Sequence, residues 1–109
     1  MTIEITPQAL HQLIQDDQAA ARLQLVDVRR QEEVAIGTLP NAHHLVLQEL
    51  PQRWQELDPT LPTVTLCHHG VRSLQAAQFL LQQGFAQVQS LKGGIDRWSQ
   101  EIDPSLPRY

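Results

Sequence analysis

The sequence predicts an α/β fold, a single domain in which a mainly parallel central sheet carries helices on both faces. Short apolar runs rich in strand-forming residues alternate along the chain with stretches that repeat apolar residues at helical spacing. Strands separated by helices form parallel sheets that helices cover on both sides. The 109 residues fit one domain, expected to span 1–109, and the hydrophobic content of 41% is that of a globular protein.

The first half of the chain contains three predicted elements. Thr6 followed by Pro7 is typical of a helix N-cap and first turn, and apolar residues at helical spacing extend this helix over 7–16. The apolar run at 23–28 predicts a buried strand, and 32–36 a short helical turn that a glycine ends.

The second half repeats the alternation. The clearest strand is TVTLC, followed by a polar loop and a helix whose glutamines face solvent and whose alanines face the core. Gly84 is placed to end that helix. In order, the expected elements are a short strand at 44–47, a weakly amphipathic helix at 48–57, a strand at 63–67, a helix at 73–83 and a strand at 87–91.

The chain closes with a helix and a proline-containing tail. Two consecutive glycines lead into a helix that carries Trp98, and the prolines of residues 103–109 prevent its continuation. We interpret this tail as a surface strap in which Leu106 and Tyr109 cover apolar surface.

Charge and hydropathy argue against two classes of partner, nucleic acids and membranes. The formal charge is -4, and the eight lysines and arginines are scattered, so we expect no nucleic-acid partner. The chain begins without the features of a signal peptide and has no apolar run near 18 residues. We therefore expect a soluble, cytoplasmic protein with no membrane partner, and the oligomeric state stays open.

Two polar clusters fall at predicted strand ends, where α/β sheets bind their ligands. One is Asp27-Val28-Arg29, and the other runs from Cys67 to Ser73. In the second, a glycine that permits positive φ lies between a strand end and a helix start, so consecutive backbone N–H groups can form a cradle for an anion around the thiol.

Cys67 is the only cysteine, so it has no disulfide partner within the chain. Thiolates are the reactive form of cysteine and are favoured near helix N-termini and cations, which Arg72 and either His68 or His69 can supply. Two alternatives are a buried structural cysteine and a zinc site. The spacing of the candidate ligands argues against zinc, and no metal or cofactor is expected; the candidates are Cys67, His68, His69, His43 and His44.

Three segments resemble motifs of rhodanese-like domains, and they follow one another in the same order and at similar spacing. CHHGVRS resembles their active-site loop, LVDVRRQEEVAIGTLPNA their Asp-Val-Arg and Gly-His-Ile-Pro-Gly-Ala stretch, and LKGGIDRW their Gly-Gly-x-x-x-Trp. The C-terminal part is also similar to rhodanese domains of sulfur-carrier-activating enzymes. The departures are Thr38, where the family often has His, and Asn41, where it often has Gly.

The resemblance implies a sulfurtransferase. Cys67 would accept a sulfane sulfur from a small donor such as thiosulfate, become a persulfide, and pass the sulfur to cyanide, a thiol or a protein. Cys67 and Arg72 are the predicted catalytic residues, with Asp27 and Arg29 as supporting, loop-orienting or ion-paired residues. The remaining residues of the predicted active-site loop are His68, His69, Gly70, Val71 and Ser73.

Two other functions are kept as alternatives. Rhodanese-like domains also serve as non-enzymatic binding or regulatory modules, typically where the cysteine is lost. A cysteine phosphatase would use a similar cradle, but with five residues between Cys and Arg. Here four residues separate Cys67 from Arg72, which predicts a ring suited to one sulfur atom.

Overall fold

A computed structural model describes residues 3–109, in which five strands form one parallel sheet. β4 is central and pairs with β2 on one side and β5 on the other. The spatial order is β1-β5-β4-β2-β3. Residues 1 and 2 of the predicted domain lie outside the described residues. The strands are β1 (Glu4–Ile5), β2 (Gln24–Asp27), β3 (His43–His44), β4 (Thr63–Leu66) and β5 (Val88–Leu91).

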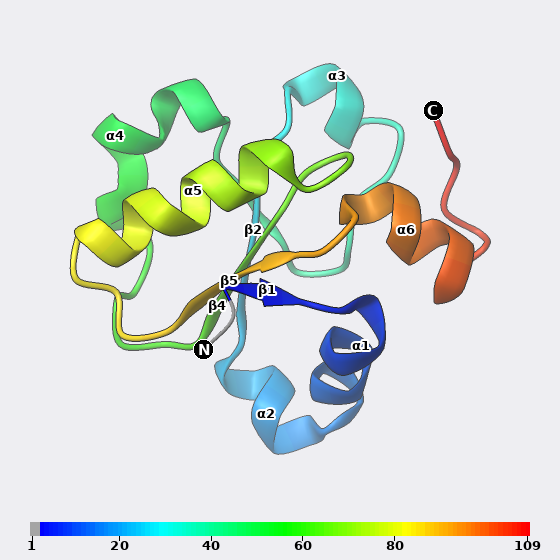
Figure 1. Cartoon of the computed structure of the whole chain (residues 1–109), viewed down its shortest axis with the longest axis horizontal. Helices are drawn as coiled ribbons and strands as arrows, with labels where there is room; N and C mark the ends of the chain where they lie inside the picture. Colours follow the sequence, from blue (N-terminus) through cyan, green and yellow to red (C-terminus); the bar gives the residue numbers. More distant parts are fainter. Residues whose placement is uncertain (1–2) are drawn as a thin grey trace.

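Helices cover both faces of this sheet, which confirms the predicted architecture. Figure 1 shows α4 and α5 on one side of the strands and α1 and α2 on the other. Two separate clusters of buried apolar side chains lie under them, one including residues of α5 and the other residues of α1 and α6. The helices are α1 (Pro7–Gln15), α2 (Asp17–Arg22), α3 (Gln31–Val34), α4 (Leu50–Arg53), α5 (Val71–Gln82) and α6 (Gly94–Glu101).

Local signals explain where the main helices begin and end. The Thr6 hydroxyl accepts the N–H of Ala9, as expected of an N-cap. The alanines of α5 are fully buried as predicted, and Gly84 follows its C-cap with a positive φ. Asn41 also has a positive φ, of 65°, which asparagine tolerates better than most residues; the resembled pattern often has glycine there.

Two elements were not predicted. The Asp16 carboxylate accepts the N–H groups of Gln18 and Ala19, so it ends α1 and caps the separate helix α2. β1 has only two residues, and its pairing with β5 joins distant parts of the chain. Local sequence therefore carries little information about β1.

Most predicted boundaries differ from the structure by a residue or more, and three elements show a local reason. The strand expected at 44–47 lies at His43–His44, because Leu47 already begins a 3-10 turn, η1 (Leu47–Glu49). The helix expected at 48–57 is reduced to α4, with η1 before it and η2 (Trp54–Glu56) after it. α5 begins at Val71, two residues earlier than predicted, because the left-handed Gly70 turns the chain directly into the helix.

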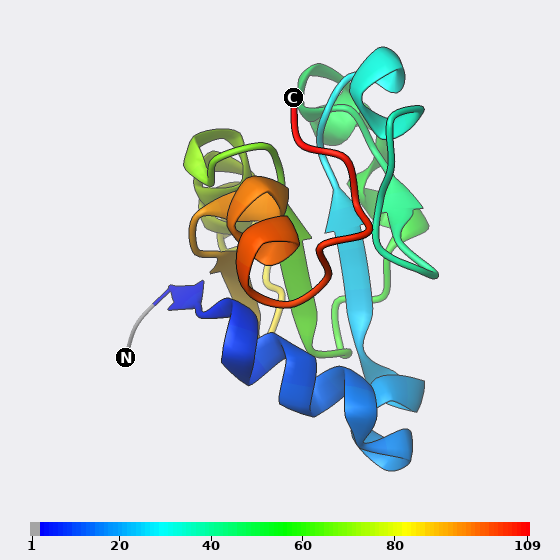
Figure 2. The ribbon, with the colours of Figure 1, turned by 90° about the vertical axis from the view of Figure 1, so that its right-hand side faces the viewer.

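The tail runs back from the end of α6 along the molecule toward α3, as Figure 2 shows in red. Leu106 packs against the apolar cluster that contains Trp98, as the strap interpretation predicts. No helix within residues 3–109 has the length and apolar character needed to cross a membrane.

Candidate active site

The Cys67 thiol lies in a cradle of backbone N–H groups at the end of the central strand. Cys67 directly follows β4 and is 1% exposed. Gly70 has a φ of 105°, and the N–H groups of Gly70 and Ser73 point at Sγ at N···S distances of 3.0 and 3.4 Å. The predicted cradle is therefore present, formed by a loop and the first turn of α5.

The start of α6 holds the outer side of this loop. The N–H groups of Ile95 and Asp96 donate to the carbonyl oxygens of Cys67 and His68 at 2.8 and 3.1 Å. Gly94 has a φ of 65°, and a Cβ there would collide with the backbone carbonyl groups of both loop residues. The carbonyl groups of the loop thus face α6, while N–H groups of the loop face the sulfur. Sequence reasoning missed that Gly94 allows this close approach of α6.

Two buried serines lie under the thiol. Sγ of Cys67 is 3.4 Å from the Ser73 hydroxyl, which lies 2.7 Å from the hydroxyl of Ser90 on β5. Both serines are 0% exposed. A thiolate at Cys67 can accept the Ser73 O–H while Ser73 accepts from Ser90. Ser90 was not singled out from the sequence, where the available signal was a polar residue at a buried strand position.

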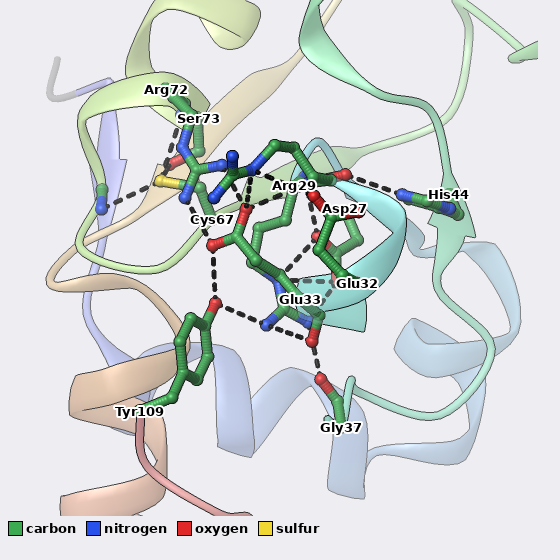
Figure 3. Close-up of polar contacts among 12 residues, drawn as sticks. Asp27, Arg29, Glu32, Glu33, Gly37, His44, Cys67, Arg72, Ser73 and Tyr109 are labelled. Carbon is green, nitrogen blue, oxygen red and sulfur yellow. Dashed lines mark hydrogen bonds and ion pairs between the residues drawn. The ribbon is translucent and has the colours of Figure 1, made fainter. Parts of the chain in front are cut away.

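Asp27 and Arg29 form a buried ion pair beside the cradle, which confirms the ion-paired interpretation. The Nη2–Oδ2 distance is 2.7 Å, with side-chain exposures of 0% and 1% for Arg29 and Asp27. Arg29 also donates to the carbonyl oxygen of Gly37 (Figure 3). The Thr38 hydroxyl donates to Asp27 Oδ2 at 2.7 Å. Thr38, one of the departures from the family pattern, therefore contributes to this pair.

Arg72 reaches Glu33 of α3 with both arms of its guanidinium. The Nη1–Oε1 and Nη2–Oε2 distances are 2.6 and 2.9 Å. This hydrogen bonding to Arg72 is the main reason that the pKa of Glu33 lies well below its usual range, and it also raises the pKa of Arg72. A thiolate at Cys67 would act on the pKa of Arg72 in the same direction. Glu33, within the acidic helix of the motif, was not recognised as a site residue.

Tyr109 brings the tail into the site, which the strap interpretation did not predict. Its ring stacks on that of His68 at a centroid distance of 4.0 Å and an angle of 11°. Its hydroxyl accepts from Arg29 and donates to Glu33, both at 2.9 Å. Tyr109 thus contacts polar groups of the site rather than only apolar surface, and no local pattern in residues 103–109 signals this.

The remaining loop residues differ in their surroundings. The rings of His68 and His69 lie 3.9 Å apart, and burial, followed by the charge of His69, lowers the pKa of His68. His68 Nε2 is buried without a hydrogen-bond partner among residues 3–109, which suits a neutral imidazole. His69 and Val71 are exposed. His44, one of the weighed zinc ligands, bonds the carbonyl oxygen of Arg29.

In the part of the chain that the structure describes, no group of three or more His, Cys, Asp or Glu side chains is placed to hold a metal ion. The chemistry of the site is that of a buried thiol surrounded by hydrogen-bond donors, beside two arginines that are each paired with a carboxylate.

The chain belongs to the rhodanese-like domain family, whose model matches residues 6–101. It is 37% identical to the putative sulfurtransferase YtwF of Bacillus subtilis, over 93% of this chain and 94% of that protein. It is 36% identical to the thiosulfate sulfurtransferase GlpE of Actinobacillus pleuropneumoniae, over 97% and 94%. It is also 36% identical to rhodanese-like/PpiC domain-containing protein 12 of Arabidopsis thaliana, a chloroplastic protein of which it spans only 37%.

Solved structures show the same fold. A rhodanese-related protein from Thermoplasma volcanium superposes with a TM-score of 0.81 at 28% identity, covering 91% of this chain and 92% of that one. The reduced CoADR-RHD of Bacillus anthracis superposes with a TM-score of 0.83 at 21% identity, covering 99% of this chain but only 18% of that one. The same fold therefore also occurs within a much longer chain.

Proposed function

We propose that this protein is a sulfurtransferase that carries sulfur as a persulfide on Cys67. The observation that carries the proposal is the pair of N–H groups, from Gly70 and Ser73, that converge on Sγ. Donors fixed around one sulfur stabilise negative charge on the thiolate and on the sulfur it receives. Family membership and the sulfurtransferase names of two relatives support the same reaction.

Thiosulfate is the proposed donor. The Cys67 thiolate attacks the outer sulfur of thiosulfate, so that a new S–S bond forms while the bond to the sulfonate sulfur breaks, and sulfite leaves with the electron pair. A nucleophile such as cyanide or a thiolate then attacks the terminal sulfur of the persulfide and regenerates the Cys67 thiolate. Neither step needs a metal or an organic cofactor.

Arg72 is proposed to act on the anionic donor rather than on sulfur directly. Its side chain is 32% exposed, so Arg72 is partly open to solvent while Glu33 holds both arms of its guanidinium. A dianion that approaches Cys67 is attracted by this cation. Asp27 and Arg29 are proposed to support the site by fixing the chain after β2, since their ion pair is fully buried.

The test is the intact mass of the protein before and after thiosulfate, with thiocyanate production from cyanide measured in parallel. We expect the wild type to gain one sulfur atom and lose it to cyanide, and Cys67→Ser to remain folded by circular dichroism but form no persulfide. Appreciable turnover by folded Cys67→Ser would refute the role of Cys67.

Aryl phosphate hydrolysis tests the phosphatase alternative in the same samples. The ring of the cradle is short, and its N–H groups lie close to one sulfur atom, which leaves little space for a tetrahedral phosphate. We expect no Cys67-dependent hydrolysis and little competition from phosphate or vanadate. A wild type that hydrolyses aryl phosphate through Cys67 and never gains sulfur would replace the proposal.

A further inference from the structure

We infer that Tyr109 is a positioning residue of this site, whose hydroxyl fixes the Glu33 carboxylate and, through it, the Arg72 guanidinium. The inference rests on the proposed function, in which Arg72 attracts the anionic donor. It assigns the tail a part in sulfur transfer, in addition to the apolar surface that Leu106 covers.

The hydroxyl of Tyr109 connects two charged groups of opposite sign. It accepts from Arg29 Nη1 and donates to Glu33 Oε2, each at 2.9 Å (Figure 3). Arginine has only donors and a carboxylate only acceptors, so the direction of both hydrogen bonds is fixed. Burial raises the pKa of Tyr109, which keeps the proton needed for the bond to Glu33.

The Arg29 end of this chain of contacts is rigid. The Arg29 side chain is fully buried, forms a fork with Asp27, and donates to the carbonyl oxygens of Gly37 and Glu33. A hydroxyl bound to this guanidinium is therefore held in place relative to the end of β2.

The Glu33 end is where Tyr109 matters for Arg72. Oε2 receives two side-chain donors, Arg72 Nη2 and the Tyr109 hydroxyl, while Oε1 receives Arg72 Nη1 and both the backbone N–H and Nε of Arg30. A two-armed arginine contact requires both carboxylate oxygens in one plane. Without the hydroxyl, Oε2 keeps only Arg72, so the carboxylate and guanidinium can turn together.

The ring and the hydroxyl of Tyr109 make separable contacts. The ring stacks on His68, whereas the hydroxyl bonds Arg29 and Glu33. Tyr109→Phe therefore keeps the stack that docks the tail and removes only the two hydrogen bonds.

The first measurement is thiosulfate kinetics of the full chain. In Tyr109→Phe we expect KM for thiosulfate to rise on the order of tenfold, the usual effect of losing a hydrogen bond to a charged group, with kcat changed less than about twofold. The control is Arg108→Ala, because Arg108 lies in the same tail but pairs with Asp96 of α6 rather than with Glu33. An unchanged KM in Tyr109→Phe, or an equal rise in Arg108→Ala, would overturn the inference.

The second measurement does not require sulfur transfer. In a cycle of Tyr109→Phe, Arg72→Ala and the double variant, we expect the unfolding equilibrium constants to deviate from multiplicative behaviour by a factor of about two or more. Independent effects would overturn the positioning role even in an active protein. If the wild type never forms a persulfide but the cycle shows coupling, the proposed function fails and the positioning role stands.

Discussion

The two halves of the site are built in different ways. The cradle around Cys67 comes from one short segment and uses backbone N–H groups, which every non-proline residue has. The network beside it, from Asp27 through Tyr109 to Arg72, uses side chains from distant parts of the chain. The cradle therefore depends on backbone conformation, and the network on the identity of individual side chains.

This difference separates the expected effects of substitutions. Removing one partner of the buried Asp27–Arg29 pair leaves a buried charge unpaired and should mainly reduce stability. Changes in the cradle alter where N–H groups point and should mainly reduce sulfur transfer. Three substitutions test this comparison.

The largest expected loss of stability follows Asp27→Ala. The change leaves the fully buried Arg29 without its carboxylate, and breaking a buried pair in this way costs about 3–5 kcal/mol. Chemical denaturation measures the free energy of unfolding. Exposed Glu56 pairs with Arg53 at the surface, so Glu56→Ala is the control and should reduce the free energy of unfolding far less than Asp27→Ala. Equal effects of the two changes would remove the contrast between a buried and a surface pair.

A moderate loss of stability but a large loss of activity is expected for Gly94→Ala. A Cβ at this position meets the loop carbonyl groups, so the loop must shift. We expect the free energy of unfolding to fall by about 2 kcal/mol. Persulfide formation should slow on the order of a hundredfold, because the backbone N–H groups no longer point at the Cys67 sulfur.

Gly84→Ala is the matched control, since Gly84 also has a positive φ but an added Cβ there meets nothing within 4 Å. Gly84→Ala should also lose stability, because alanine is strained at a positive φ. It should keep normal sulfur transfer, measured by intact mass after thiosulfate. Normal transfer in Gly94→Ala would show that the contact with α6 does not shape the cradle.

The smallest effect is expected from Glu33→Gln and depends on pH. Because Arg72 lowers the pKa of folded Glu33, the charged carboxylate stabilises the fold above the ordinary glutamate pKa of about 4.3, and this contribution is lost as the pH falls below that value. The free energy of unfolding of the wild type should exceed that of Glu33→Gln by about 1 kcal/mol near neutral pH.

Thermal or chemical unfolding between about pH 6 and pH 3 measures how this difference shrinks. Exposed Glu32→Gln serves as the control, with an expected difference near zero. A wild-type advantage that stays constant over this range would mean that the charge of Glu33 does not contribute.

Local sequence patterns predicted the alternation of strands and helices, the cap at Thr6 and the cradle after β4, and they left loop orientation or ion pairing as the roles of Asp27 and Arg29. Each of these depends on residues within a few positions of one another, where periodicity, capping and turn chemistry act. The loop from Cys67 to Ser73 was predictable because the thiol, the glycine and the helix start are adjacent in the chain.

Which distant side chains complete the site depends on how the chain packs in three dimensions. Tyr109 lies 76 positions from Glu33, and Ser90 lies 17 from Ser73, so their contacts follow from how the strands and the tail pack. The same holds for β1, which exists through its pairing with β5, and for Gly94, whose small size matters only because α6 lies against the loop. Such contacts leave no periodic signal in the sequence, because they join residues that are far apart along the chain.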